Sequence, residues 1–365
     1  MDTISNKIIV NYDNKPLYNI ILTDDFSDLS QSLVQLGMDN RRFMIITDQN
    51  VSNHYLKLMV EIMKPIANSV ETFIFPPGEK NKNLDTVNKC YEQLIENSFD
   101  RNDVLIALGG GVVGDLTGFI AASYLRGIRF IQVPTSLLAM VDSSIGGKTG
   151  VDYKSYKNMI GAFHQPSLVY MNLSTLDTLP DREYHSGMAE IIKHGLIRDS
   201  EYLTSLSNNY KEILVKKYDI IKEMIIKSCM IKKEIVERDP KEAGERALLN
   251  FGHTIGHSIE KLKEFSLLHG ECVGIGMAAA SYMSYSRGYI SEEDYDLILQ
   301  IIKKFNLPTN VSNLSVNDIY KVTLLDKKMD SDKIRFILLR KIGEAYIDPT
   351  VTKEELTEAI QTIIS

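Results

Sequence analysis

Three histidines and one glutamate lie where the chain could bind a metal ion. His253 and His257 are one helical turn apart in an apolar segment flanked by glycines, and His269 follows in a second segment. This i, i+4 spacing is familiar in metal sites, although a lone pair also occurs as core packing with satisfied ring nitrogens. With Glu190 upstream, one carboxylate and two imidazoles match a catalytic metal site that keeps positions open for substrate. Spacing alone favours His253 and His257 as the histidine pair.

Basic residues surround these candidate ligands in the sequence. Glu190, Lys193 and His194 fall at i, i+3 and i+4 of one expected helix, which by itself predicts an exposed, salt-bridged helix face. Lys232 and Arg246 are each expected to be solvated charges, as is a later basic pair at residues 327–328. Together these cations could hold a carboxylate and a phosphate.

A glycine-rich turn follows the apolar residues 104–108 and leads into a helix expected to begin near Val112. Glycines in such a turn let backbone amides and a helix N-terminus approach a pyrophosphate. The spacing is not GxGxxG, and glycine turns after strands also serve tight packing, so both interpretations stay open. Asp48 ends an earlier β-rich run, where a carboxylate can bind ribose hydroxyls, and Glu79 and Lys82 follow another. Taken singly, Glu79 or Lys82 would be a solvated loop charge.

Residues 134–149 follow a further β-rich run, at 129–133, and gather hydroxyls, Asp142, two adjacent glycines and Lys148. The glycine pair before Lys148 has the chemistry of a phosphate-binding turn but lacks the GxxxxGK[ST] spacing of a P-loop. We interpret Lys148 as an anion contact of the substrate.

The elements that position these residues change in type along the chain. β-rich runs alternate with helical patterns at residues 42–47, 51–64, 70–75, 84–97 and 104–108, which indicates βαβ units and a parallel sheet. After about Pro180 the β-rich runs become rare, and residues 212–237 carry apolar side chains at helical spacing. We expect an α/β domain over residues 1–178 and a mostly α-helical domain over 179–365. A late run at 334–339 predicts a short hairpin strand.

The composition excludes several functional classes. With 41 Lys and Arg against 48 Asp and Glu, the net charge is −7, so nucleic acid and an anionic membrane are poor partners. Cys90, Cys229 and Cys272 are widely spaced, which fits buried thiols in a reducing cytoplasm. A polar N-terminus and the lack of a long apolar run predict a cytoplasmic protein without a membrane span.

Taken together, these motifs resemble the 3-dehydroquinate synthase family of sugar phosphate cyclases. The matching segments are residues 77–82, 109–115, 137–150, 157–161 and 249–257, within a resemblance that spans roughly residues 40–340. It implies an N-terminal NAD-binding α/β domain with a mainly parallel, Rossmann-like sheet, a mostly helical C-terminal metal-binding domain, and an active site in the cleft between them.

The resemblance also implies a ligand set. Zinc, or sometimes cobalt, is expected on Glu190, His253 and His269, and His257 is then assigned to the substrate. This replaces the pair that spacing favours. A homodimer is implied as well, with Arg126 reaching the substrate phosphate from a second subunit.

The remaining site residues come from the same matching. The implied NAD contacts are Asp48, Glu79, Lys82, Gly110, Gly111, Val112, Gly114, Asp115, Thr135, Ser136, Asp142, Lys148, Lys157, Thr175, Thr178 and Glu183. Around the substrate phosphate are Lys148, Asn158, His257, Lys328 and Arg126. Around the carboxylate and ring hydroxyls are Lys193, Lys232, Arg246, Asn250 and Asp142. The chain departs from the family pattern at Ser136, His194 and Asp152, and His194 is expected beside the metal site or at the surface.

The implied reaction converts 3-deoxy-D-arabino-heptulosonate 7-phosphate into 3-dehydroquinate and phosphate, with NAD used and regenerated in each turnover. Another sugar phosphate cyclase, such as 2-deoxy-scyllo-inosose synthase, would take a substrate without a carboxylate, and Arg246 and Asn250 argue against it. A metal-dependent polyol dehydrogenase would release NADH, yet a neutral polyol needs no cluster of basic groups. A non-catalytic nucleotide-binding regulator would have no reason to keep a metal triad.

Overall fold

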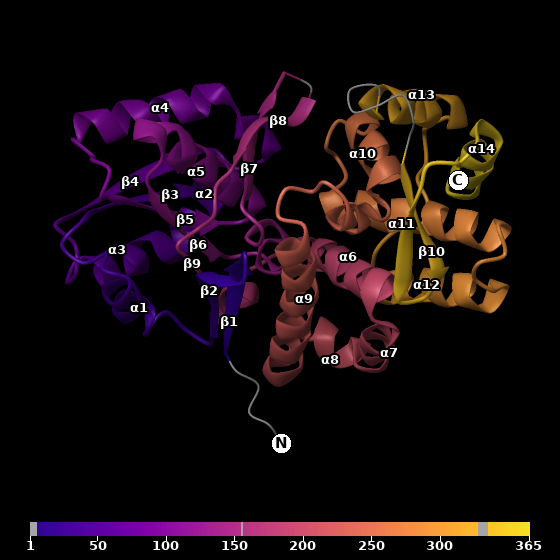
Figure 1. Ribbon diagram of the computed structural model, residues 1–365, viewed down its shortest axis with the longest axis horizontal. Helices are drawn as coiled ribbons and strands as arrows, with labels where there is room; N and C mark the ends of the chain where they lie inside the picture. Colours follow the sequence, from indigo (N-terminus) through magenta and orange to yellow (C-terminus); the bar gives the residue numbers. More distant parts are fainter. Residues whose placement is uncertain (1–5, 155, 328–334) are drawn as a thin grey trace. The chain divides into compact units, whose positions relative to one another are not determined.

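Residues 6–154, 156–327 and 335–365 are described by a computed structural model. The chain divides into a first unit, Met1–Leu179, and a second unit, Pro180–Ser365. The first unit is built on a seven-stranded sheet with the order β1-β2-β9-β6-β5-β3-β4 (Figure 1). All neighbouring strands are parallel except β1 and β2. The strands are β1 (Lys7–Tyr12), β2 (Lys15–Thr23), β3 (Arg42–Asp48), β4 (Ser69–Phe75), β5 (Val104–Gly109), β6 (Arg129–Pro134) and β9 (Leu168–Asn172).

Helices cover both faces of this sheet, and the strands alternate between two cores. On β3 (Arg42–Asp48), Met44 and Ile46 pack with α4 (Leu84–Glu96) and α5 (Gly111–Ser123), whereas Phe43 and Ile45 pack with α1 (Leu29–Gln35) and α3 (Lys57–Met63). Figure 1 shows these helices on the two faces of the sheet. Apolar side chains on both faces are typical of buried parallel strands. The helices are α1 (Leu29–Gln35), α2 (Gln49–Val51), α3 (Lys57–Met63), α4 (Leu84–Glu96) and α5 (Gly111–Ser123). A separate antiparallel hairpin joins β7 (Lys148–Tyr153) to β8 (Tyr156–Phe163).

The strand order reverses between β3 and β5. From β3 the chain continues outwards to β4, then returns to β5 on the other side of β3 and goes on to β6. Ligands of open α/β sheets bind at such switch points, outside the carboxyl ends of the strands. The loops after β3 and β5 therefore occupy the expected ligand edge of the sheet.

The second unit is mostly helical. Its helices are α6 (Asp181–Arg198), α7 (Ser200–Asn208), α8 (Tyr210–Leu214), α9 (Tyr218–Arg238), α10 (His253–Leu262), α11 (His269–Ser286), α12 (Glu292–Lys304), α13 (Val316–Lys327) and α14 (Lys353–Thr362). Helix α11 is central, because α6, α10, α12 and α14 all pack against it. A hairpin of β10 (Phe336–Lys341) and β11 (Glu344–Asp348) completes the unit.

The mainly parallel sheet and the helical second unit confirm the predicted fold class. Residues 212–237, which carry apolar side chains at helical spacing, are divided between two helices, because α8 ends at Leu214 and Lys216 takes a left-handed φ of 55° before α9 begins. The late hairpin strand is present as β10, although residue 334 of the expected run lies outside the described residues.

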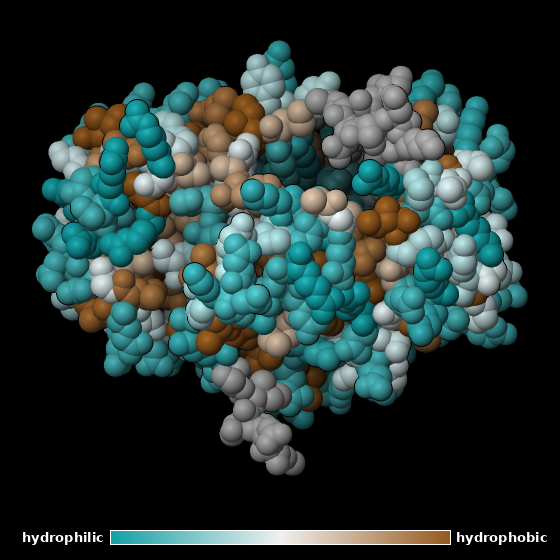
Figure 2. Space-filling view, viewed as in Figure 1, coloured by the Kyte–Doolittle hydropathy of each residue, from teal (hydrophilic) through white to brown (hydrophobic). Residues whose placement is uncertain are grey.

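The three cysteines are buried, as expected. Hydrophilic residues predominate on the face drawn in Figure 2, and hydrophobic residues form separate small patches there. Over the described part of the chain, every helix is too short or too polar to cross a membrane.

Candidate active site

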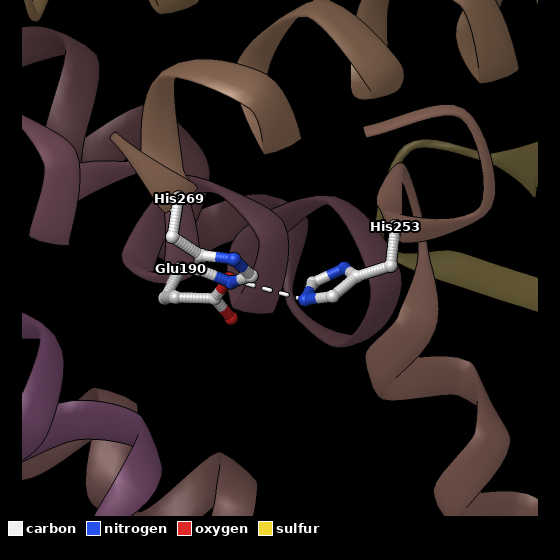
Figure 3. A group of neighbouring side chains, drawn as sticks. All are labelled: Glu190, His253 and His269. Carbon is white, nitrogen blue, oxygen red and sulfur yellow. Dashed lines mark ion pairs between the residues drawn. The ribbon is translucent and has the colours of Figure 1, made fainter. Parts of the chain in front are cut away.

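A glutamate and two histidines from three helices of the second unit meet at one point (Figure 3). Glu190 lies on α6, His253 is the first residue of α10, and His269 is the first residue of α11. Glu190 Oε1 lies 3.5 Å from His253 Nε2 and 3.5 Å from His269 Nε2. Zinc bonds of about 2.0–2.1 Å in a tetrahedral arrangement place ligand atoms about 3.3 Å apart. The three side chains therefore fit a divalent metal such as zinc.

The hydrogen bonds around Glu190 and His253 leave Glu190 Oε1 and His253 Nε2 available to a metal. Glu190 is fully buried, and its Oε1 accepts no hydrogen bond from the described residues, while its other carboxylate oxygen contacts Lys193. A buried acceptor without a donor is unfavourable, and a bound cation would remove that penalty. His253 Nδ1 lies 3.2 Å from the Phe251 carbonyl oxygen. Donation from Nδ1 leaves the Nε2 lone pair directed at Glu190.

The surrounding charges suit metal binding. Burial by itself raises the pKa of Glu190, but the Lys193 charge holds it well below 4.5, so the carboxylate is ionised. Burial and the Lys193 charge lower the pKa of His253 well below 6.5, which keeps this imidazole neutral. Burial also opposes a proton on His269, yet Glu190 and Glu260 raise its pKa to about 9. A metal that binds His269 must displace that proton.

Glycines bring the ligand-bearing helices together. Gly252 has a left-handed φ of 81° immediately before His253. A Cβ on Gly276 would lie 1.9 Å from the Gly252 carbonyl oxygen, and one on Gly256 would lie 2.9 Å from a backbone oxygen of α11. The close approach that these glycines allow is therefore made by α11.

The helix face shared by Glu190, Lys193 and His194 is buried, so the prediction of an exposed, salt-bridged face is wrong. Helical spacing shows which residues share a face but not what packs on it, and here α9 and α11 pack against α6. His194 Nδ1 lies 2.6 Å from Ser228 Oγ on α9. A surface position for His194 is therefore excluded.

Two overlapping groups of potential ligands share His269. One is Glu190, His253 and His269, and the other is His257, Glu260 and His269, with ligand atoms within 4.8 Å of one another in each group. His253 and His257, the pair that spacing favours, fall in different groups. Sequence reasoning missed Glu260, although a glutamate three residues after His257 shares its helix face.

Three further cations of the second unit are buried. Lys193, Lys232 and Arg246 expose 5% or less, so the prediction that Lys232 and Arg246 are solvated charges is wrong. Arg246 Nη1 donates to the Pro240 carbonyl oxygen at 2.8 Å. Asn250, in the same 3₁₀ turn Glu245–Asn250, donates from Nδ2 to Glu242 Oε1 at 3.0 Å. Lys193 contacts Glu190, and the elements that carry Lys232 and Arg246 contact α6, so this part of the unit gathers buried positive charge that suits an anionic ligand.

In the first unit, most of the expected NAD residues follow the carboxyl ends of five adjacent parallel strands. They come after or at the end of β4 (Glu79, Lys82), β3 (Asp48), β5 (Gly110, Gly111, Val112, Gly114, Asp115), β6 (Thr135, Ser136) and β9 (Thr175, Thr178). Parallel strands end at one edge of the sheet, so these residues lie along that edge.

The glycine turn between β5 and α5 serves close packing, and its geometry is compatible with the second role left open by its sequence. A Cβ on Gly114 would lie 2.6 Å from Gln132 Oε1, which shows that α5 packs closely on β6. Gly110 is the N-cap of α5 and has no side chain to cover the first amides of the helix. Amides at such a helix start suit a pyrophosphate, so the turn fits NAD.

Lys82 is buried rather than a solvated loop charge. Its Nζ lies 2.7 Å from Asp115 Oδ2, 3.5 Å from Glu79 Oε1 and 2.5 Å from Asn158 Oδ1. Burial alone would lower the pKa of Lys82, but Asp115 and Glu79 raise it above 10.5. Lys82 therefore stays charged and connects the loop after β4 to the first turn of α5 and to β8.

The other expected site residues occupy several elements. Asp142 lies in a π-helical turn (Ala139–Ser143), Lys148 is exposed at the start of β7, Lys157 and Asn158 lie on β8, Arg126 is exposed with a left-handed φ of 69°, and Glu183 is exposed in the first turn of α6. Lys328 lies outside the described residues. Glu183 thus belongs to the second unit, unlike the other expected NAD contacts.

Family profiles and a curated relative match this chain. The 3-dehydroquinate synthase N-terminal family matches residues 72–186, and the 3-dehydroquinate synthase C-terminal family matches residues 187–329. A 3-dehydroquinate synthase from Acetivibrio thermocellus is 42% identical over 355 residues, which cover 97% of this chain and 98% of the relative.

Two solved structures share the fold over nearly their whole length. A 2-epi-5-epi-valiolone synthase from Streptomyces hygroscopicus subsp. jinggangensis, with NAD+ and Zn2+ bound, has a TM-score of 0.88 and 25% identity, covering 97% of this chain and 98% of that one. A 2-deoxy-scyllo-inosose synthase with carbaglucose-6-phosphate, NAD+ and Co2+ has a TM-score of 0.87 and 25% identity, covering 98% and 99%. The identity to both is lower than to the Acetivibrio relative. The chain therefore belongs to the 3-dehydroquinate synthase family.

Proposed function

We propose that this chain converts 3-deoxy-D-arabino-heptulosonate 7-phosphate into 3-dehydroquinate and phosphate, with NAD held by the first unit and a divalent metal held by Glu190, His253 and His269. The supporting observation is the 3.5 Å separation of Glu190 Oε1 from both histidine Nε2 atoms in a chain of this family. Bound at these residues, the cation would supply Lewis-acid polarisation of substrate hydroxyls, and NAD would supply a hydride acceptor that is regenerated within the turnover.

The second unit binds the carboxylate end of the substrate. Lys193, Lys232 and Arg246 are buried cations, and Asn250 adds an amide in the same 3₁₀ turn as Arg246. A bound carboxylate offsets the unfavourable burial of positive charge, and Arg246 has the planar donor pair that suits it. These residues fix one orientation of the sugar ring. A neutral polyol would gain nothing from them, which argues against a polyol dehydrogenase.

We assign His257, Lys148 and Asn158 to the phosphate on the resemblance to the family. When the substrate carries a ketone next to the reacting C–H, that proton is acidic, and a phosphate oxygen of the substrate itself can take it. The C–O bond to phosphate then breaks, and donors from these side chains stabilise the departing dianion. Lys328 is assigned to the same group by family resemblance alone.

Ring opening and aldol closure complete the product. Both steps are intramolecular, so the contribution of the chain is to hold one conformer while water is kept away from the reacting carbons. The carboxylate contacts and the phosphate-binding side chains provide that orientation.

Arg126 is assigned to the phosphate of a partner subunit, and the active form is a cytoplasmic homodimer. Its exposure and left-handed backbone, beside Leu125 with φ 49°, suit a side chain that reaches outwards. Strained positions of this kind occur at binding sites. Light scattering of the purified protein tests the dimer directly.

The reaction is tested by supplying zinc-loaded protein with substrate and with NAD at one tenth of the substrate concentration. The expected result is phosphate in several-fold excess over NAD, with 3-dehydroquinate formed and no NADH accumulating. NADH formed in proportion to substrate would identify a dehydrogenase instead. Equal phosphate release from glucose 6-phosphate, which has no carboxylate, would identify a different cyclase.

A further inference from the structure

Glu260 lies on the side of His269 that faces away from Glu190. It belongs to the last turns of α10 and exposes 3% of its surface. Glu260 Oε2 lies 3.7 Å from His269 Nδ1, and Glu190 Oε1 lies 3.5 Å from Nε2 of the same ring. One imidazole is thus placed between two carboxylates, one at each ring nitrogen.

The two ring nitrogens have different tasks when a histidine binds a metal. A neutral imidazole has one N–H donor and one lone pair, so a metal on Nε2 leaves the proton on Nδ1. A carboxylate beside that Nδ1–H fixes the tautomer and the ring orientation and makes Nε2 a stronger ligand. His253 has a comparable arrangement, because its Nδ1 faces the Phe251 carbonyl oxygen at 3.2 Å.

We propose that Glu260 is a positioning residue that holds His269 with Nε2 directed at the metal. The inference rests on the metal site of the proposed function, and it assigns Glu260 no direct contact with metal or substrate. One feature of the fold supports it. Glu260 and His253 are on α10, whereas His269 begins α11, so the ion pair joins the two helices that bring the histidines together.

The same residues also allow a competing arrangement, in which His257, Glu260 and His269 hold a cation themselves. In that arrangement the metal would occupy Nδ1 of His269. A neutral imidazole has a lone pair on only one of its nitrogens, so it can bind only one cation. A metal on Nε2 of His269 and a metal on Nδ1 therefore exclude each other as long as the ring keeps its N–H proton. Glu190 Oε1 lies 3.5 Å from the Nε2 atoms of both His253 and His269, and Glu190 and His253 are buried, which favours the cation on Nε2.

The test compares zinc affinity and stoichiometry in the full-length protein, measured by competition with a chromophoric chelator. Glu260→Gln keeps the shape of the side chain and removes its charge, so we expect one zinc per chain bound about 10–100-fold more weakly. Glu260→Asp keeps the charge at shorter reach and should give a smaller loss. Glu264→Gln, an exposed carboxylate just beyond α10, is the matched control and should leave affinity unchanged.

A second measurement separates positioning from a general loss of structure. Thermal unfolding of the metal-free variants should stay close to that of the unmodified protein, and the visible spectrum of the Co2+-loaded Glu260→Gln variant should shift. Unchanged zinc affinity in Glu260→Gln would overturn the inference. Two zinc ions per chain falling to one in that variant would instead identify Glu260 as a ligand, and would overturn it too. An unmodified protein that binds no metal would refute the proposed metal site itself.

Discussion

Replacing Gly276 by alanine tests how closely α10 and α11 must approach to form the metal site. Gly276 lies within α11, and its added methyl carbon would stand 1.9 Å from the carbonyl oxygen of Gly252, the residue before His253. Real contacts of this kind stay at or above 3.0 Å, so the two helices must separate by about 1.1 Å. The obstacle is backbone on both sides, which leaves no flexible side chain to yield.

The size of that separation sets the expected effects. Metal sites hold their ligand distances within about 0.2 Å, so moving His253 away from His269 by about 1 Å should weaken zinc binding at least tenfold. Overpacking typically costs about 1–3 kcal/mol, and the better helix propensity of alanine returns about 1 kcal/mol. The expected net loss of stability is about 0–2 kcal/mol.

Gly274 provides the matched control on the same helix. A Cβ there would lie 3.2 Å from the Pro308 carbonyl oxygen and 3.5 Å from Leu307 Cβ, contacts that a shift of a few tenths of an ångström relieves. Gly274→Ala should therefore keep the zinc affinity of the unmodified protein. Chelator competition and urea unfolding of the two variants measure both quantities. If Gly276→Ala binds zinc as tightly as Gly274→Ala, the close packing of α10 and α11 does not determine the metal site.

Three further predictions concern other parts of the two units. His269→Ala should lose bound metal and activity together, whereas His257→Ala should keep metal content near normal and lose activity. Equal metal loss in both variants would indicate instead that His253 and His257, the pair with i, i+4 spacing, are ligands. Lys82→Met should destabilise the protein by roughly 3 kcal/mol and raise the Kd for NAD, because it leaves the partly buried Asp115 carboxylate without its partner; unchanged urea unfolding and NAD titration would contradict this. The hydrogen bond from Arg287 holds the pKa of Glu355 below 4.5, and burial raises the pKa of Asp348 but Thr350 and Arg287 together hold it below 3.8. The two ion pairs with Arg287 therefore stabilise the fold above about pH 4, and this stabilisation is lost as pH falls through the lowered pKa values. Arg287→Met should therefore cost about 2 kcal/mol at pH 7 and less at pH 3, and a pH-independent cost would show that the ion pairs contribute little.

The fold follows from the sequence more completely than the site does. Alternating β-rich and helical patterns predict a parallel sheet, and loss of β-rich runs after Pro180 predicts a helical second half, because period and length are local properties. The break between α8 and α9 has no local signal, since the left-handed residue there is Lys216 rather than glycine or asparagine.

Burial is what sequence spacing could not supply. Helical spacing predicts an exposed face for Glu190, Lys193 and His194, because charged residues at that spacing usually face solvent. In the structure, α9 and α11 cover this face. Likewise, the i, i+4 pair on α10 suggested two ligands from one helix. The structure instead gathers one side chain from each of three helices, a grouping that only tertiary packing determines.

The most direct test of the ligand set is anomalous diffraction at the zinc edge from crystals of the zinc-loaded protein. The account predicts one zinc peak per chain, bonded to Glu190, to His253 Nε2 and to His269 Nε2, with the Nδ1 atom of His269 directed at Glu260. A peak bonded to His257, either with His253 or with Glu260 and His269 Nδ1, would contradict it.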